Sequence, residues 1–519
     1  MKKLLLITTF LFTLTFYAQN NPDFYLAPNG VTCMCPGADF GDTGTLTING
    51  ETKTFTKRSR AQLNALDEQD PYIALTCTSG IEDMSSLFVL QSLFNQALNS
   101  WDVSNVTTML QMFYGATSFD QPLDNWDVSN VTDMGSMFEG AYSFNQNINN
   151  WDVSQVTDMA YMFNEAISFN QPLNNWDVSN VTTMLGMFRD TDLFNQPVND
   201  WNVSQVENMR NMFWQNASFD QPLNNWDVSQ VANMGNMFFR ATSFNQPLNN
   251  WDVSNVTDME SMFNRATSFD QPLDNWDVSQ VTDMSIMFAF SAFNQPLNSW
   301  DVSNVTDMVG MFWDATSFNQ NINNWDVSQV TNMRNMFYLA TSFDQALNSW
   351  DVSNVTDMVG MFRSATSFNQ PLNSWDVSNV TVMFQMFRSA TSFNQDLSGW
   401  CVQQIPNEPF EFALNSALQN DFFPNWGAEC NLSTTNPEAI GFNILIYPNP
   451  SNSKVFIEND GQIILSKIKL IDMLGRDIKT LSASQITNGL DVSGVDAGNY
   501  FVQFTTVDNQ QFVKRLIVN

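Results

Sequence analysis

Thirteen tryptophans stand at a fixed spacing along this chain, and that spacing limits the folds open to it. From Trp101 to Trp400 each lies 25 residues after the one before, except for a single 24-residue step between Trp276 and Trp300. A period in the twenties is typical of a solenoid, in which each repeat buries its apolar face only against its neighbours. A function shared by all repeats must be useful in many copies, which favours binding or structural roles over catalysis.

The repeat that begins at Trp251 shows which side chains are expected in the core. Leu248, Trp251 and Val253 fit a short strand whose Trp and Val side chains point inward. The next apolar residues recur at i, i+3, i+4 and i+7, which predicts one face of a helix: Met259, Met262, Phe263 and Ala266. Thr257 suits the N-cap of that helix. The sequence therefore predicts an α/β solenoid of strand–helix units over residues 76–399, with the methionines as core residues.

The two ends of the chain interrupt the repeat. Residues 1–19 combine two lysines, a short apolar run and a small residue, as in a secretory signal peptide. No later segment is apolar for long enough to form a transmembrane helix. We expect an N-terminal cap region at residues 20–75, a C-terminal cap at residues 400–430 and a linker at residues 431–441.

The net charge and the lack of histidine limit the partners and the catalytic mechanisms open to this chain. The chain has a formal net charge of −33 and no histidine. Such an acidic chain repels nucleic acid. The lack of histidine excludes Ser-His-Asp and Cys-His catalysis and removes the commonest metal ligand. Because no repeat carries a unique polar cluster, we expect a non-catalytic protein. Calcium, bound by Asp and Asn oxygens, is the one cofactor that the composition leaves open.

The residue after each tryptophan forms the main candidate row for a ligand. On parallel strands these carboxylates would lie about 4.8 Å apart and repel one another by roughly 1 kcal/mol. A row of calcium ions, a cationic ligand or local hydrogen bonds from serine and the backbone would offset that repulsion. Asn202 interrupts the row, which favours the local hydrogen bonds. The candidates are Asp102, Asp127, Asp152, Asp177, Asp227, Asp252, Asp277, Asp301, Asp326, Asp351 and Asp376.

Other side chains at variable positions are weaker candidates for ligand contacts. Trp214 and Trp313 follow the Met-Phe pair of their repeats and are candidate exposed aromatics. The arginines of the array are expected on solvated helix faces, with contacts to an anionic ligand as the alternative. They are Arg189, Arg210, Arg240, Arg265, Arg334, Arg363 and Arg388.

Five cysteines in an exported chain favour disulfide bonds. Cys401 and Cys430 bracket the C-terminal cap, and we expect them to pair. Cys77 is expected to pair with either Cys33 or Cys35, which leaves one thiol over. The sequence does not decide between these two.

The repeated unit is specific enough to show a family resemblance. From Phe244 to Phe263 it reads Phe-Asn-Gln-Pro-Leu-Asn-Asn-Trp-Asp-Val-Ser-Asn-Val-Thr-Asp-Met-x-x-Met-Phe. This pattern, over residues 76–430, resembles the BspA-like family of bacterial leucine-rich-repeat surface proteins. The resemblance implies a location on the cell surface and, for some members, adhesion to host matrix proteins or to other bacteria.

The C-terminal segment has a different composition. Short alternating strands between turn signals predict a small all-β sandwich over residues 442–519. Its motifs resemble the type A sorting domain of the type IX secretion system. The residues that carry the resemblance are Tyr447, Pro448, Asn449, Pro450, Gly475, Gly498, Tyr500, Lys514 and Arg515. The resemblance implies a Gram-negative bacterium of the Bacteroidetes group, export by the type IX machinery, removal of this domain, and attachment to the cell surface or release.

The sequence as a whole therefore predicts an exported cell-surface repeat protein for adhesion or multivalent binding of an extracellular protein or glycan. One alternative is a calcium-binding structural surface protein. Another is a glycan-binding module of a polysaccharide-uptake system. An enzyme is the least favoured class.

Overall fold

A computed structural model describes residues 21–429, 444–459, 465–472, 476–482, 485, 489–507 and 511–518. These residues fall into two compact units, divided between residues 428 and 429. The predicted signal peptide and the predicted linker at residues 431–441 lie outside the described residues. Within the described ranges, no helix has the length and apolar character needed to cross a membrane.

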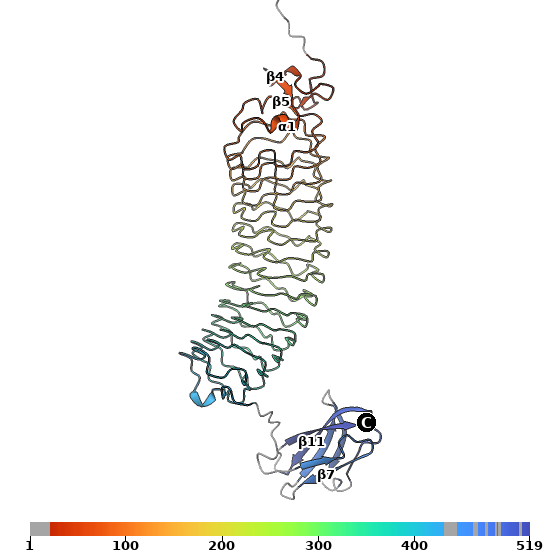
Figure 1. Ribbon diagram of the computed structural model, residues 1–519, viewed down its shortest axis with the longest axis vertical. Coiled ribbons are helices and arrows are strands. Elements are labelled where there is room, and N and C mark those ends of the chain that lie inside the picture. The colour runs from red at the N-terminus through yellow and green to blue at the C-terminus, as the bar shows by residue number, and fades with distance from the viewer. Residues whose placement is uncertain are drawn as a thin grey trace, which may run out of the picture. The chain divides into compact units, whose positions relative to one another are not determined.

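The repeats form a stack of coils (Figure 1). Between β5 (Thr76–Cys77) and the 3-10 helix η1 (Asn420–Phe422) the described chain contains no helix and no named strand. Successive coils are joined instead by single parallel β-bridges, the first between Asp83 and Thr108. The predicted α/β solenoid of strand–helix units is therefore wrong.

The predicted helix fails because its backbone bonds to the next coil. The N–H of Met259 donates to the carbonyl oxygen of Asp283 at 3.1 Å, and the N–H of Phe263 donates to that of Met287 at 3.0 Å. An α-helix would direct these groups to the residue four positions earlier. The N–H of Met262 closes a turn on the carbonyl oxygen of Met259 at 3.2 Å. Turns within a coil thus alternate with hydrogen bonds between coils.

Backbone dihedral angles give the same answer. Ser261 and Arg265 have φ values of 55° and 60°, and equivalent positions in other repeats are also left-handed. An α-helix has no place for such residues, since its φ is close to −60°. Thr257, predicted as an N-cap, instead donates its hydroxyl to the carbonyl oxygen of Ala232 in the preceding coil at 3.3 Å.

The side chains predicted to be inward do form the core. Met259, Met262, Phe263 and Ala266 are fully buried, and Trp251 is 2% exposed. Tryptophan rings of successive repeats lie almost parallel, with centroids 6.2–6.5 Å apart in nine pairs. The 24-residue step leaves this column intact. The apolar spacing therefore identified the buried face although it gave the wrong backbone.

The N-terminal cap region is built from short strands. β1 (Tyr25–Leu26) pairs with β2 (Cys33–Met34), and β3 (Thr43–Ile48) pairs with β4 (Glu51–Lys57), all antiparallel. β4 also pairs in parallel with β5. The one short helix of this region, α1 (Arg60–Leu63), is capped by the side chain of Ser59.

A disulfide bond links this region to the start of the array. Cys35 is bonded to Cys77, and Cys33 is a free, buried thiol. One cysteine of the three is thus left over, as the sequence predicted. Cys401 is also disulfide-bonded, and its predicted partner Cys430 lies outside the described residues.

The second unit is all-β. Its strands are β6 (Ile444–Tyr447), β7 (Lys454–Asn459), β8 (Leu465–Ile471), β9 (Asp477–Ser482), β10 (Leu490–Asp491), β11 (Gly498–Thr506) and β12 (Gln511–Val518). They form two antiparallel sheets with strand orders β10-β7-β6 and β12-β11-β8-β9. Val455 of one sheet and Ile468 and Val502 of the other share one buried core.

Candidate ligand-binding groove

The carboxylates that follow the repeat tryptophans close local turns. Each of the eleven predicted row members accepts a hydrogen bond from the backbone N–H of the serine two residues later. Asp252 also accepts from the Ser254 hydroxyl at 2.6 Å. Hydrogen bonds from the following serine hold the pKa of Asp152, Asp252, Asp301 and Asp351 below the usual range. Local hydrogen bonds from the serine and the backbone therefore offset the repulsion within this row.

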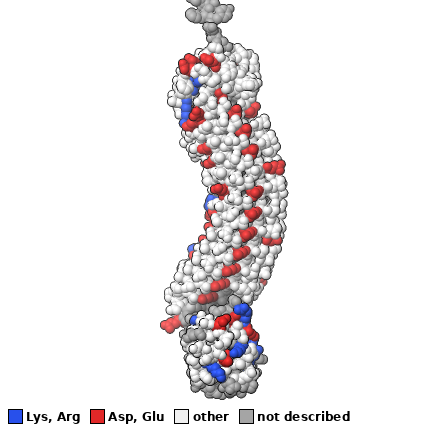
Figure 2. All heavy atoms as spheres, turned by 90° about the vertical axis from the view of Figure 1, so that its right-hand side faces the viewer, with Lys and Arg blue, Asp and Glu red and all other residues white. Residues whose placement is uncertain are grey.

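Most of this row is exposed, although Asp102 is buried and also accepts a hydrogen bond from the Ser79 hydroxyl. Figure 2 shows acidic side chains in lines along the array, with few cationic side chains on that face. Within the described residues, no group of three or more His, Cys, Asp or Glu side chains could hold a metal ion. The calcium hypothesis thus gains no support from the described part of the chain.

The two candidate aromatics are half-buried members of stacks. The ring of Trp214 lies 4.0 Å from that of Phe239. Trp313 lies between Phe290 and Tyr338, at centroid distances of 5.2 and 5.5 Å. Each tryptophan therefore already has an aromatic partner on a neighbouring coil, and neither stands alone as an exposed contact.

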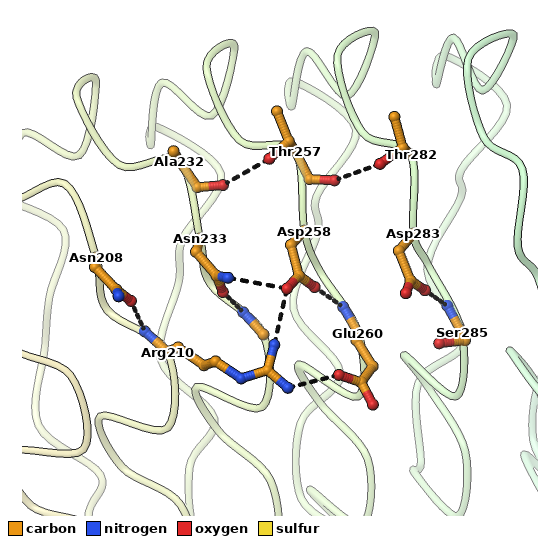
Figure 3. A network of polar contacts seen from close by, with 11 residues as sticks. Asn208, Arg210, Ala232, Asn233, Thr257, Asp258, Glu260, Thr282, Asp283 and Ser285 are labelled. Atoms are coloured by element: carbon orange, nitrogen blue, oxygen red, sulfur yellow. Dashed lines mark hydrogen bonds and ion pairs between the residues drawn. The ribbon is translucent and has the colours of Figure 1, made fainter.

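A second acidic line, which sequence reasoning missed, follows the β-bridges. Its carboxylates are Asp83, Asp133, Asp158, Asp258, Asp283, Asp307 and Asp357. Each closes a turn, as Asp283 does by accepting from the N–H of Ser285 at 2.8 Å (Figure 3). These side chains are half-buried, and three pairs lie on adjacent coils: Asp133 with Asp158, Asp258 with Asp283, and Asp283 with Asp307. Burial and the charge of Asp283 raise the pKa of Asp307 above its usual value.

Arg210 neutralises part of this line by reaching across two coils. Its guanidinium lies 2.8 Å from Asp258 and 2.7 Å from Glu260 (Figure 3). Gly235 leaves the space for it, because a Cβ there would lie 2.6 Å from Arg210 Nη1. Asn233 adds a further donor, from Nδ2 to Asp258 Oδ2 at 2.9 Å. Carboxylates of this line thus have partners within the protein wherever an amide or an arginine stands beside them.

We expect Asp283→Asn to stabilise the protein at pH 7 by about 0.5–1 kcal/mol. The new amide would face Asp307 as Asn233 faces Asp258, and one of two neighbouring charges would be lost. The folded-state pKa of Asp307 lies above its unfolded value, so its ionisation costs stability as pH rises through the folded pKa. The gain should therefore shrink as the pH falls toward about 4. Urea unfolding of wild type and variant at both pH values measures this.

Asp277→Asn is the matched control, since it removes the same charge from the exposed row and keeps the turn to Ser279. An equal gain in both variants would mean that only net charge matters.

A groove of about 840 Å³ interrupts the regular surface of the array between residues 190 and 317. Its main contributors stand fourteen positions after successive tryptophans, all with φ between 52° and 60°. One such residue comes from each of six consecutive coils: Asp190, Gln215, Arg240, Arg265, Phe290 and Asp314. Asp192, Ala217, Thr242, Thr267, Ser291, Ala292, Thr316 and Ser317 complete the lining.

Arginines occupy the middle of the groove. Arg240 Nη1 donates to Gln215 Oε1 at 2.8 Å, and Gln215 in turn donates to Asp190. The guanidinium of Arg265 lies 3.9 Å from the centroid of the Phe290 ring. Packing on that ring positions Arg265 by a cation–π contact.

The groove arginines differ from most arginines of the array. Of the seven, four form ion pairs with carboxylates: Arg189, Arg210, Arg334 and Arg388. The guanidinium of Arg240 bonds only to the amide of Gln215, as that of Arg363 outside the groove bonds only to Gln385. The guanidinium of Arg265 makes no hydrogen bond or ion pair with any described residue. Sequence reasoning placed both on solvated helix faces, whereas the structure places them in one groove.

Two of the three carboxylates at the groove ends also lack direct partners. The side chains of Asp192 and Asp314 make no hydrogen bond or ion pair with any described residue, whereas Asp190 is paired with Arg189 and Gln215. Burial and the neighbouring Asp190 raise the pKa of Asp192, and burial raises that of Asp314 although Arg265 opposes it. The groove thus combines a hollow with charges of both signs, and those of Arg265, Asp192 and Asp314 form no ion pair with any described residue.

The sorting-domain residues have structural contacts of their own. Asn449 Oδ1 accepts from the Ile517 N–H at 2.9 Å, and its Nδ2 donates to the carbonyl oxygen of Arg515 at 2.7 Å. Arg515 Nη2 donates to Asn499 Oδ1 at 2.9 Å. Tyr500 donates its hydroxyl to the carbonyl oxygen of Asp496 at 2.9 Å. These motif residues therefore tie β11 and β12 to the segment that follows β6.

The remaining motif residues are more dispersed. Gly498 begins β11 opposite Val518, and Lys514 pairs with Val502. Tyr447, Pro448 and Pro450 are exposed, and Gly475 lies outside the described residues.

Comparison with known families covers most of the chain. Six overlapping stretches between residues 60 and 426 match the family described as Mycoplasma protein of unknown function, DUF285. Residues 445–519 match the family described as Secretion system C-terminal sorting domain. No curated protein and no solved structure matched. These matches do not confirm the resemblance to BspA-like leucine-rich-repeat proteins.

The sorting-domain match agrees with the motifs quoted above and supports secretion through the type IX system, which is typical of surface or secreted proteins of Bacteroidetes. The repeat matches span well over half of the chain. The chain therefore belongs to the DUF285 family of repeat proteins and ends in a secretion-system sorting domain.

Proposed function

We propose that this protein is a non-catalytic binding protein of the cell surface that holds an extracellular ligand in the groove between residues 190 and 317. The observation that carries the proposal is the coincidence of a hollow with two arginines that form no ion pair with any described residue, in a repetitive and acidic array. Hydroxyl side chains such as Thr242, Thr267 and Ser317 add hydrogen-bonding groups to its walls. Type IX export supports contact with ligands outside the cell.

Several features support binding rather than catalysis. The groove has no histidine, and the Asp190 carboxylate is engaged by Arg189 and Gln215. The other two carboxylates, those of Asp192 and Asp314, stand five coils apart, about 24 Å at ~4.8 Å per coil. The carboxylates of a hydrolytic pair lie about 5–10 Å apart. Adhesion is the biological role that we propose for such binding, with the uniform coils serving to hold the groove away from the cell.

Filling the groove tests the proposal. Thr242→Trp would place a large side chain in the groove wall and should abolish binding to any ligand found on arrays of extracellular proteins and glycans. Thr391→Trp is the matched control, because Thr391 is exposed at the equivalent position of a distant coil and makes the same hydroxyl contact at 3.5 Å. A ligand that binds both variants as well as wild type would show that the groove is not the site.

A further inference from the structure

Charges along the groove follow a fixed order. Asp190 and Asp192 lie at one end, Arg240 and Arg265 in the middle, and Asp314 at the other end. The repeat spacing places the midpoint between the arginines about 12 Å from the coil of Asp190 and about 12 Å from that of Asp314, at ~4.8 Å per coil. The groove is therefore negative, positive and negative along its length.

We infer that the groove binds an extended polypeptide segment with one carboxylate between two basic side chains, each about four residues from it. This inference rests on the proposed function and names its ligand class. Four residues of extended chain span about 13 Å, which matches the distance from the arginines to either acidic end.

The arginines suit the central carboxylate. A guanidinium binds a carboxylate through two parallel N–H donors, which fixes orientation as well as charge. Arg265 is positioned by Phe290, while its guanidinium N–H groups have no acceptor among the described residues. Arg240 spends one donor on Gln215 and retains others. A ligand carboxylate would thus meet donors that are already in place.

The acidic ends select against polyanions. A uniform acidic polysaccharide would set its carboxylates against Asp190, Asp192 and Asp314, where like charges repel. The net charge of −33 also repels polyanions at long range and attracts basic segments. The carboxylates of Asp192 and Asp314 form no ion pair with any described residue, although Arg265 acts on Asp314 from a distance, so a ligand lysine or arginine at each end would supply a direct partner.

Two peptides of equal net charge that differ only in the order of their charged residues test the inference on the full-length protein. The probe is a fluorescent nine-residue peptide with lysine at both ends, glutamate in the centre, and serine or glycine between. Its isomer carries the glutamate at one end and the lysines at the centre and the other end, with the same net charge. We expect the isomer to bind at least about tenfold more weakly by fluorescence anisotropy, a loss of about one charge pair. Equal affinities would overturn the inference, because only net charge would then matter.

Charge reversal in the groove tests the same assignment from the protein side. The double variant Arg240→Glu/Arg265→Glu should lose about tenfold or more in affinity for the probe. Ser364→Glu/Ser389→Glu changes the same backbone position in two other coils and should bind the probe as wild type does. Unchanged melting temperatures establish that both variants are folded. Equal losses in the two double variants would overturn the inference.

The remaining outcomes separate this inference from the proposed function. If a galacturonate trimer binds wild type and loses affinity in Arg240→Glu/Arg265→Glu, the ligand is an acidic glycan and the peptide assignment fails. If no peptide binds while Thr242→Trp abolishes binding of an array ligand, the inference fails and the groove remains a binding site. If Thr242→Trp changes no interaction, both fail.

Discussion

Replacing Trp251 with alanine is expected to lower the free energy of unfolding of the repeat array by about 3–5 kcal/mol. The ring is 2% exposed and lies parallel to those of Trp226 and Trp276, at centroid distances of 6.3 and 6.5 Å. Its Nε1 also donates to the carbonyl oxygen of Leu223 at 2.9 Å. The substitution would open a cavity between three coils and remove one of the two hydrogen bonds of that carbonyl, which would keep the bond from the Trp226 N–H at 3.1 Å. Urea unfolding followed by circular dichroism measures the loss.

Trp214→Ala is the control for this experiment. Trp214 is half-exposed and contacts one aromatic ring, so its removal should cost about 1 kcal/mol. Each coil packs only on its neighbours, and Trp251→Ala should therefore also broaden the transition or divide it in two. If both substitutions lowered the free energy of unfolding equally, the buried stack of Trp251 would not stabilise the array more than the half-exposed Trp214 does.

Removing the disulfide between Cys35 and Cys77 is expected to destabilise the N-terminal cap by about 3–4 kcal/mol. The bond joins residues 42 positions apart and links the cap to the start of the array. Close to it, Thr78 donates its hydroxyl to the carbonyl oxygen of Asp102 at 2.8 Å. In Cys35→Ser/Cys77→Ser the cap should open before the repeats do. Limited proteolysis of residues 21–75 during a temperature series measures that order.

Cys33→Ala provides the control for the disulfide. The Cys33 thiol is fully buried, and burial together with Asp102 raises its pKa to about 12. Such a thiol is almost entirely protonated at neutral pH and does not exchange with the disulfide. The variant should keep the cap closed. Early cleavage in Cys33→Ala as well would show that packing, and not the covalent bond, holds the cap.

The sequence allowed the core of the array to be predicted but not its backbone. The spacing of Met259, Met262, Phe263 and Ala266 fits one face of a helix, and it fits equally well a run of turns that points the same side chains inward. The difference lies in where the N–H groups bond. A single repeat cannot reveal that, because the acceptors belong to the next coil. Residues such as Ser261 and Arg265 have no Gly-like signature, so their left-handed backbone also went unseen.

The candidate site was predicted less well than the core. The aspartate row was recognised because it recurs in nearly every repeat. Residues that recur in this way have a structural role here, since they close the turns of each coil. The groove was missed because the residues that line it stand at a variable position, fourteen residues after each tryptophan. There Arg240, Arg265 and Phe290 replace the small residues found in other repeats, such as Gly115 and Ser364. Only a known backbone shows that these variable side chains lie next to one another.

The left-handed position has a consequence for how such a protein can evolve. It accepts Gly115, Glu165, Arg240, Phe290 and Leu339 in the same conformation, and none of these side chains belongs to the buried core. Exchanges among such residues, which carry no branch at Cβ, leave the core untouched, so selection on the ligand and selection on the fold act on largely separate residues. Duplicating or exchanging whole coils would then produce new surfaces in one step while the chain continues to fold.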